Sequence, residues 1–202
     1  HGCIALIYSG YDQLIDRVGL TRFDENGNIL WKESYNSQDT SIVNPFGQSF
    51  IQTLDSGFLI TGKCYYEDPD EPNIFLIKPY YIKTDKNGNF EWETVVHKGI
   101  GSELKGSAWS TSIDPSGSYY YSSITQIYPD YNAPALLKMD FDGNVIDIYN
   151  IVVGYNNGGL GYATFINDTV LAASIGWGNS DDEIRNYATL IDTVGNILDT
   201  TF

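Results

Sequence analysis

The stretch Tyr81-Ile-Lys-Thr-Asp85-Lys-Asn-Gly88-Asn89-Phe-Glu-Trp92 holds two strand-forming runs on either side of a turn. Asp85 supplies a carboxylate that accepts hydrogen bonds from turn amides, and Gly88 supplies the positive φ that ends such a turn. The stretch therefore predicts a β-hairpin. Three other stretches align with it without gaps, and they run from Leu20 to Trp31, from Leu136 to Asp147 and from Ala188 to Asp199.

The spacing of these hairpins indicates a repeat. Their turn glycines, Gly27, Gly88, Gly143 and Gly195, are 61, 55 and 52 residues apart. A period of about 50 to 60 residues suits a four-stranded propeller blade with some long loops. A calcium loop is the alternative for Asp-x-x-Gly-Asn, but an EF-hand alternates more ligands before its glycine and ends in Glu. We therefore interpret the motif as a structural turn.

A second type of hairpin lies between the first ones, at residues 49–62, 109–122 and 162–174. If the strands of a blade are labelled A to D, these turns join A to B, and Asp-x-x-Gly-Asn joins C to D. Cys3 to Ser9 reads as a B strand with no A strand before it, so fifteen strands are expected. The composition also favours strands joined by turns, because Gly, Tyr, Ile, Thr, Asn and Ser are plentiful.

The predicted fold is an all-β β-propeller over residues 1–202. Its four antiparallel blades span about 1–36, 48–98, 107–153 and 160–202, and the first blade lacks its A strand. Two arrangements remain open, a closed four-bladed propeller and part of a larger propeller of six to eight blades. The larger propeller is favoured because an open blade edge invites aggregation. Completion of the disc by a partner subunit is a separate alternative.

The net charge of the chain limits the kinds of partner that it is expected to bind. The net charge is −15 and the pI about 4.2, which disfavours nucleic acid and anionic membrane surfaces. No stretch approaches the ~18 apolar residues that a membrane span needs. A glycan, a protein, a neutral or cationic ligand or a metal ion fits better, and plain solubility is the other explanation of the charge.

The start of the sequence, His1-Gly2-Cys3, indicates a processed product, a fragment or an excised piece. Cys3 and Cys64 are the only cysteines, and they occupy non-equivalent repeat positions, so the sequence does not indicate a disulfide. Lipid modification of Cys3 is a minor alternative, because two residues still precede it.

The Asp-x-x-Gly-Asn-x-x-Trp hairpins resemble the repeats of secreted bacterial β-propellers of the Bacteroidetes type. The resemblance covers all four hairpins, although the final Trp is present only as Trp31 and Trp92. It implies a secreted, periplasmic or cell-surface location and specifies fold better than function. Quinoprotein-type propellers are similar in this Trp position, which implies that the Trp docks one blade on the next. Sialidase-type propellers have a shorter Asp-x-Gly spacing, from which this chain departs.

Long connections between blade strands are where binding is expected, because loops on a rigid scaffold often carry function. The A–B and C–D turns are short, whereas the B–C connections near residues 65–73, 128–134 and 177–183 and the D–A connections at 37–48, 98–107 and 154–161 look long. Aromatic rings beside carboxylates suit a sugar ring or a protein loop. The predicted ligand-binding residues are Tyr65, Tyr66, Tyr128, Asp130, Tyr131, Trp177, Asp181 and Asp182, with packing at blade ends as the alternative for each aromatic.

The predicted function is a non-catalytic binding or scaffold module that recognises glycan or protein through the long-loop face. One alternative is a glycoside hydrolase or lyase that uses carboxylates on the same face, which needs two carboxyls roughly 5 to 9.5 Å apart. Another is a structural subunit of a larger surface or secretion complex. No cofactor is predicted, and Ca²⁺ at Asp68, Asp70 and Glu71 or at 181–183 is a minor alternative. His97 lacks the context of a catalytic triad.

Overall fold

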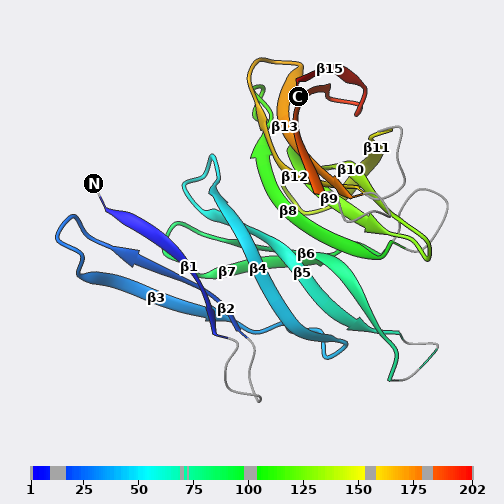
Figure 1. Ribbon diagram of the computed structural model, residues 1–202. Coiled ribbons are helices and arrows are strands. Elements are labelled where there is room, and N and C mark those ends of the chain that lie inside the picture. The colour runs from blue at the N-terminus through cyan, green and yellow to red at the C-terminus, as the bar shows by residue number, and fades with distance from the viewer. Residues whose placement is uncertain are drawn as a thin grey trace. The chain divides into compact units, whose positions relative to one another are not determined.

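The computed structural model describes residues 2–9, 17–68, 71, 73–97, 104–152, 158–178 and 184–201. All regular secondary structure in these ranges is β-strand, and it comprises fifteen strands (Figure 1). The first sheet holds β1 (Cys3–Ser9), β2 (Arg17–Phe23) and β3 (Ile29–Tyr35). The second holds β4 (Ile42–Gln52), β5 (Phe58–Glu67), β6 (Phe75–Thr84) and β7 (Phe90–Val95).

The third sheet consists of β8 (Gly106–Ile113), β9 (Tyr120–Ile127), β10 (Asn132–Met139) and β11 (Val145–Asn150). The fourth consists of β12 (Gly158–Phe165), β13 (Val170–Gly178), β14 (Ile184–Asp192) and β15 (Ile197–Thr201). In each sheet the strands pair antiparallel in chain order. The all-β class, the repeated antiparallel sheets and the three-stranded first sheet are therefore confirmed for the described residues.

The chain forms two compact units, His1–Val95 and Val96–Phe202, which we call the first and second unit. Each unit holds two of the four sheets. No helix in the described ranges has the length and apolar character needed to cross a membrane.

The four Asp-x-x-Gly-Asn turns share one hydrogen-bond pattern. In the turn of the second sheet, one carboxylate oxygen of Asp85 accepts from the amides of Asn87 and Asn89, both at 2.8 Å. The other oxygen accepts from the Asn89 side chain, also at 2.8 Å. These bonds favour the ionised form and lower the pKa of Asp85. Gly88 has φ +85°, so the predicted structural turn is confirmed.

The core of the first unit lies between its two sheets. Val18 and Leu20 of β2 pack with Phe58 and Ile60 of β5, and all four side chains are buried. Trp31 reaches from β3 to the turn of the second sheet, where a Cβ on Gly88 would lie 2.9 Å from its ring. The tryptophan role that the quinoprotein resemblance implied, docking one sheet on the next, thus holds for Trp31.

The second unit repeats this arrangement with different residues. Tyr121 and Leu136 of the third sheet are buried against Leu160 and Ile175 of the fourth. A Cβ on Gly195, in the turn between β14 and β15, would lie 3.0 Å from the Cβ of Tyr149 on β11. In both units, therefore, the turn glycine of one sheet gives room to an aromatic residue on the last strand of the sheet before it.

Several predicted loop ranges overlap observed strands; for example, β5 extends to Glu67 and β12 begins at Gly158. Strand β4 begins at Ile42 rather than near residue 48, because two register shifts and the positive φ of Asn44 keep it paired with β5. Strand β10 begins at Asn132, so the connection after β9 is a four-residue turn in which the Tyr128 amide donates to the Tyr131 carbonyl at 2.8 Å. This B–C connection is therefore short.

Candidate functional site

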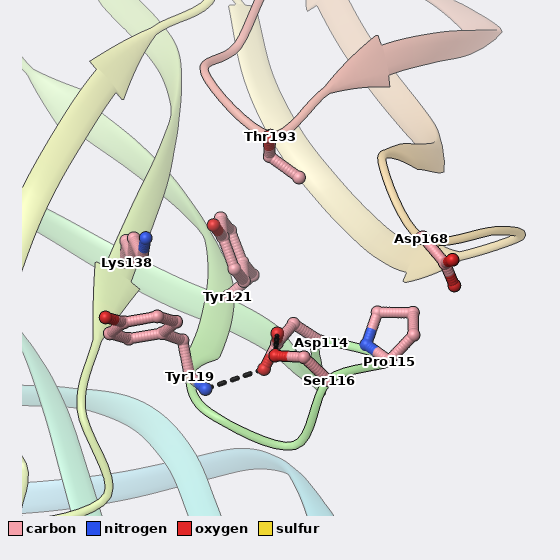
Figure 2. A pocket seen from close by; sticks show the side chains of 8 residues that line it. All are labelled: Asp114, Pro115, Ser116, Tyr119, Tyr121, Lys138, Asp168 and Thr193. Atoms are coloured by element: carbon pink, nitrogen blue, oxygen red, sulfur yellow. Dashed lines mark hydrogen bonds between the residues drawn. The ribbon is translucent and has the colours of Figure 1, made fainter.

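A cavity of about 390 Å³ opens in the second unit, at the end of the sheets that carries the A–B and C–D turns (Figure 2). The third sheet contributes its A–B turn and the adjoining ends of β9 and β10. The fourth sheet contributes one residue from each of its two tight turns. The lining residues are Asp114, Pro115, Ser116, Tyr119, Tyr121, Lys138, Asp168 and Thr193.

Asp114 holds the wall of the cavity in shape. One carboxylate oxygen accepts the amides of Ser118 and Tyr119 at 2.7 and 2.6 Å, and the other accepts the Ser116 hydroxyl. Partial burial opposes ionisation, but these donors outweigh it and lower the pKa of Asp114. The Asp114 carboxylate therefore accepts most of its hydrogen bonds from groups of its own turn.

Lys138 supplies the positive charge of the cavity. It pairs across the strands with Tyr121 on one side and Asp147 on the other. Its Nζ lies 3.8 Å from the ring centroid of Tyr119 and 5.7 Å from that of Tyr121. Both rings offer their negative faces to the ammonium. No carboxylate of a described residue lies within ion-pair distance of it.

The same repeat position in the second sheet is occupied by Lys83, which is also two residues before the turn aspartate. Lys83 is only 3% exposed. Its Nζ donates to Asp55 at 2.7 Å, to Glu91 at 2.8 Å and to the Thr84 carbonyl at 2.9 Å. The three hydrogen bonds of Lys83 connect the turn that holds Asp55 with strands β6 and β7.

The third sheet lacks both of these ion-pair partners. Ile146 stands at the repeat position of Glu91. In the strand register Asp114 takes the position of Thr53, and Ser116 takes that of Asp55. Asp114 is bound to its own turn amides. The ammonium of Lys138 is therefore left on the tyrosine rings at the edge of the cavity.

Asp168 and Thr193 line the cavity from the fourth sheet, and in Figure 2 Thr193 lies above Tyr121 while Asp168 lies to the right, near Pro115. Asp168 belongs to the turn between β12 and β13, which Asn167 shapes by accepting the amides of Thr169 and Val170. The Asp168 carboxylate is exposed and accepts no hydrogen bond from a described residue. It remains available to a ligand.

None of the eight residues predicted for ligand binding lines this cavity. Tyr128 and Tyr131 do lie together, with ring centroids 4.6 Å apart and planes at 16°, and Asp130 is exposed in the same turn. Tyr65 and Tyr66 lie near the end of β5, where Tyr66 packs on the core of the first unit. The side chain of Trp177, together with Asp181 and Asp182, lies outside the described residues.

The residues of the cavity were missed because loop length directed attention to the other end of the sheets. A signal was present in the repeat alignment, where Lys83 and Lys138 are equivalent but Glu91 is replaced by Ile146. The acidic neighbour is peculiar to the second sheet, because Leu30, Ile146 and Leu198 stand at the position of Glu91 in the other three hairpins.

The described carboxyls with a clearly shifted pKa share one direction of shift. A general acid needs a raised pKa. Every described carboxyl whose pKa departs clearly from its ordinary value has it lowered, and these are Asp24, Asp55, Asp85, Asp114, Asp140 and Asp192. Nowhere in the described ranges do three His, Cys, Asp or Glu side chains gather as a metal site would require.

A scan against protein-family models found no match for the chain, and a search of curated proteins found none either.

Proposed function

We propose that this protein is a non-catalytic carbohydrate-binding module, with the cavity of the second unit as its binding site. We further propose that the four sheets are blades of a β-propeller and that the module belongs to a secreted or surface protein. The chain-order meander of every sheet supports the propeller, as does the glycine–aromatic packing that recurs in both units. The hairpin motif, through its resemblance to secreted propellers, supports the location.

The observation that carries the proposal is the lining of the cavity. Its volume of about 390 Å³ falls in the lower part of the range usual for small-molecule sites. The free carboxylate of Asp168 and the hydroxyl of Thr193 can exchange hydrogen bonds with sugar hydroxyls. Tyr119 and Tyr121 add apolar surface with little side-chain entropy to lose.

A binding role suits these residues better than glycoside hydrolysis. Of the two carboxyls at the cavity, Asp114 has a lowered pKa and is held by turn amides. A residue fixed in this way is a poor proton donor at neutral pH. The rigid turns of the cavity are well suited to holding a ligand without reorganisation.

The test is chemical-shift mapping on the ¹⁵N-labelled protein with a panel of neutral and acidic monosaccharides and disaccharides. We expect the largest shifts at the amides of Ser118, Tyr119 and Thr193. Replacement of Asp168 by Ala should weaken binding at least fivefold, while Tyr131→Ala, at the opposite end of the third sheet, should leave it unchanged. Shifts centred on the turn of residues 128–131, or binding only to protein partners, would overturn the proposal.

A further inference from the structure

The charge of Lys138 sets it apart from the other cavity residues. A lysine ammonium in a protein is normally hydrated or paired, and Lys83 shows how this repeat pairs one. Lys138 is partly buried and rests on Tyr119 and Tyr121, without an anionic partner among the described residues. Lys138 is therefore a cation of the cavity that forms no ion pair with a described side chain, although Asp114 and Asp168 also line the cavity and Asp147 lies across the strand pair.

We propose that the cavity selects an acidic sugar, a hexuronate, whose carboxylate pairs with Lys138. This inference rests on the proposed carbohydrate-binding function and names the ligand class of the same site. A lysine–carboxylate contact is a charge-assisted hydrogen bond, roughly twice as strong as a neutral one. It gains further strength where the pair is shielded from water.

The tyrosines make Lys138 a positioned group rather than a mobile surface charge. The 3.8 Å contact with the Tyr119 ring holds the ammonium beside the cavity without neutralising it. The backbone amide of Tyr119 is in turn fixed by Asp114 at 2.6 Å. The cation is thus held ready for a ligand, which lowers the entropic cost of binding.

The two sides of the cavity differ in the partners they offer. Lys138 comes from the third sheet, and Asp168 and Thr193 come from the fourth (Figure 2). A hexuronate can place its carboxylate on Lys138 and present its hydroxyls as donors to Asp168. A ligand with carboxylates at both ends would meet repulsion at Asp168, so one carboxylate and several hydroxyls fit best.

Size is consistent with a single sugar unit. If each water occupies about 30 Å³, the cavity volume equals that of about 13 waters, which is roughly twice the volume of one pyranose, so a single sugar fits with room for ordered water. A chain would need to extend past the turns of residues 114–119 and 166–169.

The test uses glucuronate and glucose, which differ only in a carboxylate against a hydroxymethyl group. Isothermal titration, backed by the amide shifts of Tyr119, should show glucuronate binding at least tenfold more tightly. Lys138→Met should reduce this preference to within about twofold, and Lys138→Arg should restore most of it. The matched control is Lys105→Met, which removes an exposed lysine of the same unit that does not line the cavity.

The outcomes separate this inference from the proposed function. Equal binding of glucuronate and glucose at the cavity would overturn the acidic-sugar inference and leave a carbohydrate site. Binding of neither sugar, nor of any other sugar in the panel, would overturn both. Acetate binding as tightly as glucuronate would show a carboxylate site without sugar selectivity, and a preference that survives Lys138→Met would remove Lys138 from the account.

Discussion

Lys83 and Lys138 occupy one repeat position and are predicted to differ in what they do for stability. Replacement of Lys83 by Met keeps the apolar stem and removes the ammonium, which breaks its bonds to Asp55, Glu91 and the Thr84 carbonyl. The same change at Lys138 removes only its contacts with tyrosine rings, since no described carboxylate pairs with it.

The magnitude follows from how exposed the partners are. Hydrogen bonds to charged groups contribute about 1.5 to 3 kcal/mol each when well shielded. The side chains of Asp55 and Glu91 are 55% and 40% exposed, so both carboxylates regain water once Lys83 is gone, and each bond is discounted to about 1 kcal/mol. Including the Thr84 carbonyl, Lys83→Met should lower the free energy of unfolding by about 2 to 3 kcal/mol. Lys138→Met should cost less than about 1 kcal/mol.

The assay is urea unfolding of both variants at pH 7, with circular dichroism as the signal. A second readout is pH. Burial raises the pKa of Asp55, but hydrogen bonds outweigh this effect and lower the pKa to about 2. The hydrogen bond from Lys83 is the strongest of them. A carboxyl with a depressed folded-state pKa contributes stability above its unfolded value near 4, and this contribution is lost as the pH falls toward 2.

Lys83→Met should therefore flatten the loss of stability between pH 4 and 2, whereas Lys138→Met should not. Equal destabilisation by the two substitutions would refute the distinction between a structural lysine and a ligand-binding one. So would a Lys83 variant that keeps both its full stability and the acid dependence of the parent.

Two further predictions concern the turn glycines and the thiols. Gly27→Ala should cost about 1 to 2 kcal/mol from its positive φ alone, because nothing lies within 4 Å of the added Cβ. Gly88→Ala and Gly195→Ala should cost more, because the Cβ also meets an aromatic residue at about 3 Å; equal unfolding free energies for all three variants would contradict this. Cys3 is exposed and should react with a thiol reagent at pH 8. Burial, and to a lesser extent a nearby carboxylate, raise the pKa of the buried Cys64 to about 12. Cys64 should therefore react only in denaturant.

The strand plan was predictable because it rests on local chemistry. Asp85 and Gly88 specify their turn through bonds within five residues, and the repeat places the same turn four times. The docking of Trp31 was implied only by the resemblance to quinoprotein-type repeats, and its contact with Gly88 was not predicted. Strand ends were harder, because the pairing of β4 back to Ile42 depends on bulges that sequence spacing does not reveal.

The cavity could not be placed from sequence because it depends on packing between two sheets. Asp168 and Thr193 come from separate turns of the fourth sheet, far along the chain from Lys138. Loop length favoured the opposite end, yet the connection at residues 128–131 proved to be a tight turn. What sequence did contain was the difference between Lys83 and Lys138, which becomes informative only when the neighbours of each are known.

The most direct measurement is a crystal structure of the protein with glucuronate. The account predicts a sugar in the cavity of the second unit, with its carboxylate about 2.7 to 2.9 Å from the Nζ of Lys138 and a hydroxyl donating to Asp168. Glucuronate bound on the tyrosines of residues 128–131, or an empty cavity at a concentration that saturates binding in solution, would contradict it.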